Sequence, residues 1–167
     1  MKTLYLIRHA KSSRDEGVED FERSLAHRGE KDAAFMAKRL AAGRVVPCVM
    51  LSSPAVRALR TCLLFAKELE YQEKRILTVD SLYEAGATDL LSAVRGLSDA
   101  FRVALLFGHN PGVTDFAKLL LGDGGVGEIP TCGVCHFELD VHAWAELNPG
   151  DGKLLDFDYP KRHPERS

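Results

Sequence analysis

Two arginines and two histidines stand where apolar runs of the sequence give way to polar residues. Arg8 and His9 lie together in LYLIRHAKSS, Arg57 lies in SSPAVRA, and His109 lies in GHNPG. The planar guanidinium fork of arginine matches the oxygen atoms of a phosphate. Histidine is a nitrogen nucleophile near neutral pH and can carry a covalent phosphoryl group. These residue types therefore predict a phosphoryl-transfer site.

Nothing in the sequence points to a metal ion in this chemistry. The chain has no glycine-rich P-loop and no cluster of aspartates of the kind that holds Mg²⁺. Two arginines can themselves neutralise the charge of a transferring phosphoryl group. We therefore expect a site that uses neither a metal nor a cofactor.

Strands that alternate with helices are predicted to position these four side chains. The expected strands are residues 3–7, 46–52, 75–79, 102–108, 134–141 and 153–158, of which the last two can pair antiparallel. The expected helices are residues 25–42, a helix that starts near Pro54 with Ser53 as its cap, a helix capped by Thr88, and a helix from Pro111 to Leu121. This order predicts a single α/β domain whose mostly parallel sheet has helices on both faces. Because ligands bind beyond the carboxyl ends of such strands, the four side chains should meet at one edge of the sheet.

Composition sets the broad class of the protein. The chain has 167 residues, of which 46% are hydrophobic and 28% charged, and its net charge is −2. This balance is ordinary for one globular domain and gives no bulk signal for nucleic acid or an anionic membrane. The N-terminal apolar run is too short to span a membrane and lacks a cleavage site, so we expect a cytoplasmic protein. We expect the domain to cover residues 1–160 and residues 161–167 to form a frayed tail.

One motif that contains cysteines admits two interpretations. Cys132-Gly133-Val134-Cys135-His136 matches the pattern for covalent attachment of c-type haem. The same segment continues as VCHFELDV, which alternates as a half-buried strand does. No second C-x-x-C pair is present to complete a zinc site. We therefore predict a strand after a glycine turn, with the cysteines as reduced thiols.

Several segments resemble the histidine phosphatase superfamily, which includes the cofactor-dependent phosphoglycerate mutases and acid phosphatases. The marker is LIRHA at residues 6–10. Within that superfamily, RHAKSS, LAHRGEKDA, SSPAVRALRT, LYEA and GHNPG resemble the small SixA-type phosphohistidine phosphatases, in family order across residues 4–113. The resemblance implies a phosphoglycerate mutase-like fold in its short form, without the helical insertion of larger relatives.

The resemblance also implies a role for each of the four residues. His9 would attack phosphorus and become a phosphohistidine. Arg8 and Arg57 would bind the phosphoryl oxygens from two sides. His109 would give the same oxygens a hydrogen bond or a positive charge. Water would then hydrolyse the intermediate and regenerate His9.

The general acid is less sharply defined by the sequence. Relatives that cleave phosphate esters place a carboxylate after the third strand, and Glu84 in SLYEAG stands at the corresponding place. Glu84 as an acid and Glu84 as a solvated loop residue both remain open. Lys11, Ser12 and Ser13 either face the phosphate or form an ordinary polar loop. Arg28 is expected to be a structural ion-pair residue and is kept out of the catalytic set.

The leading functional hypothesis is a metal-independent phosphatase that acts through phospho-His9 on a phosphohistidine protein. The short form of the chain and the lack of a clearly defined general acid favour this hypothesis. One alternative is a small-molecule phosphomonoesterase of the same superfamily. Another is a phosphate- or phosphoprotein-binding module without turnover, which the joint presence of the four side chains disfavours. No oligomeric state is predicted.

Overall fold

The structure is a computed structural model that describes residues 1–122 and 125–166. Its centre is a sheet of six strands in the order β3-β2-β4-β1-β5-β6. The strands are β1 (Lys2–Arg8), β2 (Val49–Ser52), β3 (Leu77–Thr78), β4 (Val103–Gly108), β5 (Val134–Leu139) and β6 (Gly152–Asp158). The first four strands pair in parallel, whereas β5 runs antiparallel to both β1 and β6. The predicted α/β architecture and the antiparallel late pair are confirmed.

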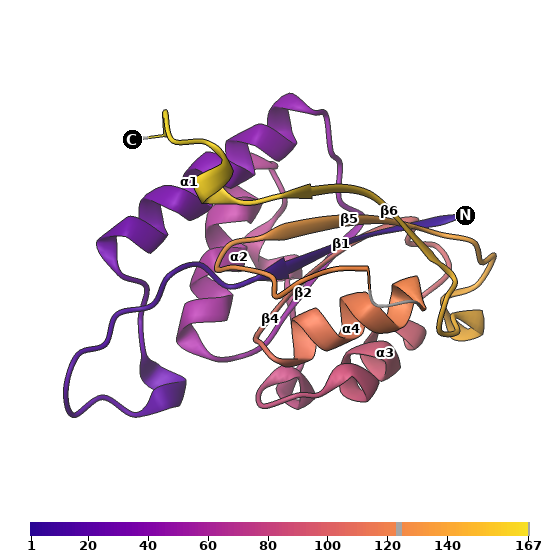
Figure 1. Ribbon diagram of the computed structural model, residues 1–167, viewed down its shortest axis with the longest axis horizontal. Coiled ribbons are helices and arrows are strands. Elements are labelled where there is room, and N and C mark those ends of the chain that lie inside the picture. The colour runs from indigo at the N-terminus through magenta and orange to yellow at the C-terminus, as the bar shows by residue number, and fades with distance from the viewer. Residues whose placement is uncertain (123–124, 167) are drawn as a thin grey trace.

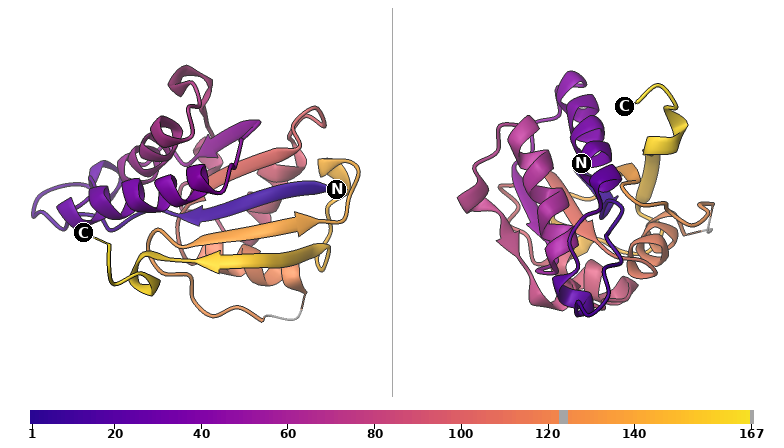
Figure 2. Two further views of the ribbon diagram at one scale, coloured as in Figure 1. Left: turned by 90° about the horizontal axis from the view of Figure 1, so that it is seen from above. Right: turned by 90° about the vertical axis from the view of Figure 1, so that its left-hand side faces the viewer.

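Helices cover both faces of the sheet, as Figures 1 and 2 show. The four helices of the described chain are α1 (His27–Ala42), α2 (Val56–Glu68), α3 (Ala87–Arg95) and α4 (Gly112–Leu121). Alternate residues of β1 point to opposite faces, so Tyr5 and Ile7 pack with α1 and α2. Leu4 and Leu6 pack with α3 and α4. Burial on both faces explains why the central strands are almost wholly apolar.

Some helix and strand boundaries differ from those expected. The first helix begins at His27 rather than at residue 25, and the second strand begins at Val49 rather than at residue 46. The predicted cap Thr88 is wrong, because α3 begins one residue earlier. The Gly86 N–H donates to the Asp89 carboxylate at 2.9 Å, so Asp89 fills the first turn.

The C-terminal residues expected to fray are instead attached to the domain. The Nε of Arg166 lies 2.8 Å from Oδ1 of Asp32 on α1, and Nε2 of His163 lies 2.6 Å from Oδ1 of Asp158 at the end of β6. Figure 1 shows this segment, in yellow, beside α1. Single charged residues far along the chain make these contacts, so composition alone did not indicate them. Ser167 lies outside the described residues.

The cysteine-containing segment forms the predicted strand. Cys132 and Cys135 are buried, and β5 begins at Val134 directly after Gly133. The four cysteines of the chain are free. Among the described residues, no helix has the length and apolar character needed to cross a membrane.

Candidate active site

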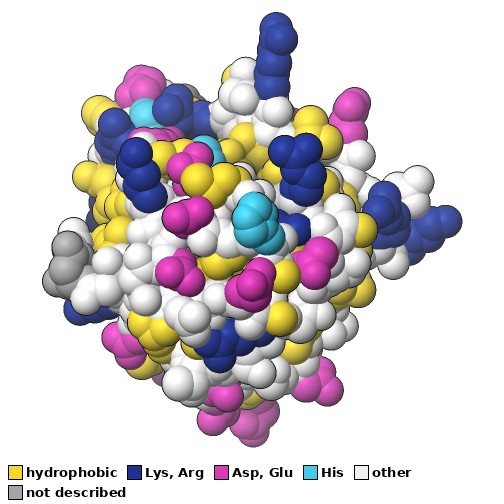
Figure 3. Space-filling view, turned by 90° about the vertical axis from the view of Figure 1, so that its right-hand side faces the viewer, with side chains coloured by type: hydrophobic (Ala, Val, Ile, Leu, Met, Phe, Trp, Pro, Cys, Tyr) yellow, Lys and Arg dark blue, Asp and Glu magenta, His cyan; other side chains and the backbone are white. Residues whose placement is uncertain are grey.

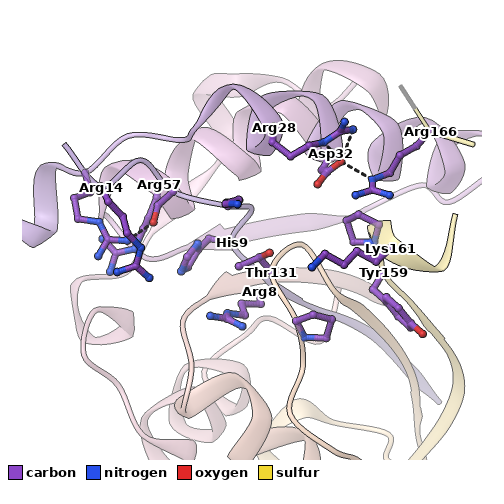
Figure 4. Close-up of a pocket in the computed structure, with 15 residues that line it drawn as sticks. Arg8, His9, Arg14, Arg28, Asp32, Arg57, Thr131, Tyr159, Lys161 and Arg166 are labelled. Carbon is purple, nitrogen blue, oxygen red and sulfur yellow. Dashed lines mark hydrogen bonds and ion pairs between the residues drawn. The ribbon is translucent and has the colours of Figure 1, made fainter. Parts of the chain in front are cut away.

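Three strand ends bring the predicted side chains together. Arg8 ends β1, and His109 follows directly after β4. Because β1 and β4 are neighbours that pair Arg8 with Gly108, the next residues of the two strands lie side by side. The ring centroids of His9 and His109 are 5.2 Å apart. Arg57 reaches the same edge from the first turn of α2, and Figure 4 shows it near His9.

His9 is held in one orientation with one ring nitrogen left over. Its backbone is fixed, since its N–H donates to the Gly108 carbonyl and its own carbonyl accepts from the Cys132 N–H. Nδ1 donates to the Ala10 carbonyl at 2.7 Å. A carbonyl can only accept, so Nδ1 carries the proton of the neutral ring and Nε2 keeps its lone pair. This is the tautomer that a nucleophile attacking through Nε2 requires.

The electrostatic surroundings keep both histidines uncharged. Burial lowers the pKa of His9 to about 3, against a hydrogen bond to Ala10 that raises it, and His109, Arg57 and Arg8 lower it further. Burial and Arg57 lower the pKa of His109 to about 4. A ring that is neutral near pH 7 is a free nucleophile rather than a blocked one. The arginines thus supply the positive charge of the site, and His9 supplies the lone pair.

Both arginines are anchored by hydrogen-bond acceptors of the protein itself. Arg8 donates from Nη1 to the Ile129 carbonyl at 2.9 Å, and its buried Nε has no partner among the described residues. Arg57 is only 7% exposed and donates to the Asp20 carbonyl at 2.6 Å and to the Asp20 carboxylate at 3.1 Å. Each guanidinium is therefore fixed along one side, and its remaining N–H groups are available to an anion.

His109 is tied to the loop after β2. Its Nε2 lies 2.7 Å from Oγ of Ser53. The prediction of Ser53 as the cap of α2 is wrong, because this helix begins at Val56 and Ala55 stands at the cap position. Ser53 Oγ also accepts the N–H of Ala55, just before α2. The buried Nδ1 of His109 has no partner among the described residues. One hydroxyl thus links the start of α2 to the second histidine of the site.

Asp20 is a residue of this site that sequence reasoning missed. Its carboxylate accepts from Arg57, from Arg23 at 3.0 Å and from the Tyr83 hydroxyl at 2.6 Å. These partners, led by Tyr83, hold the pKa of Asp20 below its usual range. The loop EGVEDFERS contains four acidic residues, and no local signal marks the one that turns toward Arg57.

Glu84 lies at the rim of the site rather than in its floor. Its side chain is exposed, and it lines a second pocket of about 470 Å³ together with His109, Arg57 and Asp20. A Cβ on Gly112 would come within 2.2 Å of the Ala85 carbonyl oxygen, so only glycine lets this loop pack so closely on α4. The carboxyl group is therefore near the site but solvated, which leaves both interpretations of Glu84 open.

The remaining candidates separate into two groups. Lys11 and Ser12 line the pocket next to His9, whereas Ser13 is not among its lining residues and bonds to the backbone at Ser24. Arg28 forms the expected ion pair, at 2.8 Å to Asp32, and it also lines this pocket.

The pocket beside His9 is strongly basic. It has a volume of about 640 Å³, and eight of its fifteen lining residues are lysine or arginine, against one acidic residue, Asp32. The opposite end of the molecule, where β1 begins, has acidic and basic side chains interspersed (Figure 3). A cluster of one sign in a concave site attracts anions. Phosphate-bearing compounds are the ligands that this arrangement of arginines and histidines fits best.

The chain belongs to the histidine phosphatase superfamily, branch 1, whose sequence profile matches residues 4–90. It is a phosphatase of the short SixA type. A solved structure from Agrobacterium tumefaciens, which carries the provisional name phosphohistidine phosphatase SixA, is 25% identical with a TM-score of 0.79 and covers 95% of this chain and 98% of its own. A tungstate complex of the protein histidine phosphatase SixA shares the fold at a TM-score of 0.83, with 19% identity over 96% of this chain and 98% of its own.

A relative of similar length is known from sequence. An uncharacterized protein of Mycobacterium tuberculosis is 28% identical over 166 residues, which cover 93% of this chain and all of the relative. The match runs through most of the chain and includes residues beyond the part matched by the family profile.

Proposed function

We propose that this phosphatase hydrolyses phosphohistidine on a protein through a covalent intermediate on His9. The observation that carries the proposal is the neutral His9 ring, whose Nδ1–H donates to the Ala10 carbonyl and whose Nε2 is left free beside two anchored arginines. The fold shared with SixA-type proteins supports the substrate class.

The reaction has two displacements at phosphorus. First, the Nε2 lone pair attacks, the phosphorus–nitrogen bond of the substrate breaks, and the leaving imidazole nitrogen takes a proton from solvent. Arg8, Arg57 and His109 hold the phosphoryl oxygens as charge spreads over them. Second, a water oxygen attacks the phosphorus of phospho-His9, loses its proton to solvent or phosphate, and returns the electron pair to Nε2. Inorganic phosphate and neutral His9 are the products.

A phosphoramidate needs little acid catalysis, because its leaving nitrogen is readily protonated. This property suits a site in which the carboxylate of Asp20 is kept ionised and is bonded to Arg57 and Tyr83. An ionised carboxylate that is fully engaged orients its partner arginine better than it donates a proton. Asp20 is therefore proposed to position Arg57.

The test is rapid-quench labelling with a protein that carries ³²P-phosphohistidine. Wild type should show a transient label that is labile in acid and stable in alkali, and His9→Ala should show none. His142→Ala, at an exposed histidine outside the site, is the matched control and should label as wild type does. Labelling of His9→Ala would refute the nucleophile. No label on any protein, with phosphate still bound, would favour a binding module without turnover.

A small-molecule phosphomonoesterase is the second candidate, and the position of Glu84 in the pocket beside His109 favours it. An ester oxygen is a poorer leaving group than a protonated nitrogen and needs an acid. If Glu84 is that acid, Glu84→Gln should reduce hydrolysis of p-nitrophenyl phosphate far less than hydrolysis of an alkyl phosphate. The control is Glu22→Gln, which changes an exposed carboxylate on the loop that precedes α1. Equal effects on both esters would exclude the acid role.

A further inference from the structure

The pocket beside His9 continues well past the residues that would hold the transferred phosphoryl group. Figure 4 shows His9 with Arg57 and Arg14 to one side and with Lys161 and Tyr159 to the other. The far side is built from α1 and from the C-terminal segment, neither of which supplies a residue to the proposed chemistry. The proposed chemistry therefore gives the far-side residues no role.

Positive charge at this far side exceeds what the protein itself neutralises. Arg28 and Arg166 share the single carboxylate of Asp32, each with a nitrogen 2.8 Å from Oδ1. Lys161 has an exposed side chain and no ion-pair or hydrogen-bond partner among the described residues. Three cations thus face one anion in a chain whose total charge is −2. An anionic group from outside the protein would restore the balance.

The segment that carries Lys161 is held firmly in place. Asp158, which precedes it, accepts from His163 at 2.6 Å and from Arg39 at 2.8 Å. Pro160 is buried, and the segment is tied to α1 a second time through Arg166. A fixed backbone lowers the entropic cost of presenting a lysine to a ligand. The far side is therefore an ordered part of the pocket and not a free end of the chain.

We infer that the substrate carries a second anionic group, a carboxylate or a phosphate, which this far side binds while the transferred phosphoryl group lies at His9. Lys161 and Arg28 supply the charge, and Tyr159 lines the pocket beside Lys161. The first phosphoryl group is already provided for by Arg8 and by Arg57 on the near side.

Two sources supply this chemistry. In a phosphohistidine protein, the second anion is an acidic side chain next to the phosphohistidine. In a small substrate, it is a second phosphate. The inference rests on the proposed function only in placing the reacting phosphoryl group at His9, and the experiment below separates the two claims.

The experiment compares two matched pairs of probes on three proteins. One pair is a phosphohistidine peptide flanked by glutamates and its counterpart flanked by glutamines. The other pair is glucose 1,6-bisphosphate and glucose 6-phosphate. The proteins are wild type, Lys161→Ala and Lys153→Ala, the last at an exposed lysine of β6 outside the pocket. Turnover gives kcat and KM, and calorimetric binding to each protein with His9→Ala added gives the same comparison without chemistry.

Wild type should prefer the doubly anionic member of at least one pair by about fivefold to tenfold, mainly through KM, with the preference falling as salt is added. Lys161→Ala should lose most of that preference, whereas Lys153→Ala should keep it. The pair that shows the effect identifies the source. Equal treatment of both members of both pairs, or a preference that survives Lys161→Ala, would overturn the inference. Selective binding without turnover of either peptide would instead contradict the proposed function and leave the inference standing.

Discussion

The two neutral histidines of the site should make the folded protein unusually sensitive to mild acid. Burial lowers the pKa of His9 to about 3 and that of His109 to about 4. In the unfolded chain both rings return to about 6.5. Between these values the unfolded state binds protons that the folded state does not. The free energy of unfolding therefore falls as the pH falls below about 6.5, and above that pH neither ring contributes.

The size of the effect follows from the two pairs of pKa values. At pH 5 each histidine is neutral in the folded protein and almost fully protonated in the unfolded chain. Each then lowers the free energy of unfolding by about 2 kcal/mol relative to pH 7.5, at about 1.4 kcal/mol per pH unit. The two together remove about 4 kcal/mol, a large share of the stability of an ordinary domain.

The variant His9→Asn isolates one half of this effect. Asparagine places an N–H donor where Nδ1 of His9 donates to Ala10, but it does not titrate. Urea unfolding at pH 7.5 and at pH 5 should show that the variant loses about 2 kcal/mol less than wild type over this range. His142→Asn, at an exposed position, should keep the wild-type loss. The same loss in wild type and His9→Asn would refute the claim that His9 is neutral because it is buried.

Three further outcomes are expected from the geometry. Arg57→Ala should lower kcat/KM by about 100- to 1,000-fold, because it removes an anchored donor to the phosphoryl oxygens. The control Arg60→Ala, one turn on and paired with Glu30 at the surface, should stay within about twofold of wild type in the same assay. Gly29→Ala should destabilise the fold by about 1–3 kcal/mol in urea unfolding, because its Cβ would lie 2.1 Å from a carbonyl oxygen of the preceding loop. The control Gly127→Ala, with open space around it, should cost less than about 0.5 kcal/mol. Arg166→Ala should cost about 1 kcal/mol in urea unfolding, and an unchanged midpoint would mean that the C-terminal segment is not held by its ion pair.

The strand ends were predictable because their signals are local. An apolar run that stops at Arg8 or before His109 predicts both a buried strand and an exposed end, and parallel pairing then brings these ends together. Asp20 was not predictable in this way. Its bond to Arg57 spans 37 residues and depends on the path of an irregular loop. The contact between Arg166 and Asp32 spans 134 residues and rests on one charge at each end.

The loop that was not predicted also helps to explain how so short a chain can orient two arginines at one pocket. A guanidinium group that must bind an anion is most effective when it is already oriented before the anion arrives. Asp20 orients Arg57 by two hydrogen bonds, and the Ile129 carbonyl orients Arg8 by one. Neither anchor uses all the N–H groups of its arginine, so both side chains keep free donors in the pocket that they line with His9. Asp20→Ala would remove the carboxylate contact and leave the backbone one. It should therefore weaken phosphoryl transfer more than phosphate binding, since Arg57 would keep its charge but be oriented by one hydrogen bond instead of two.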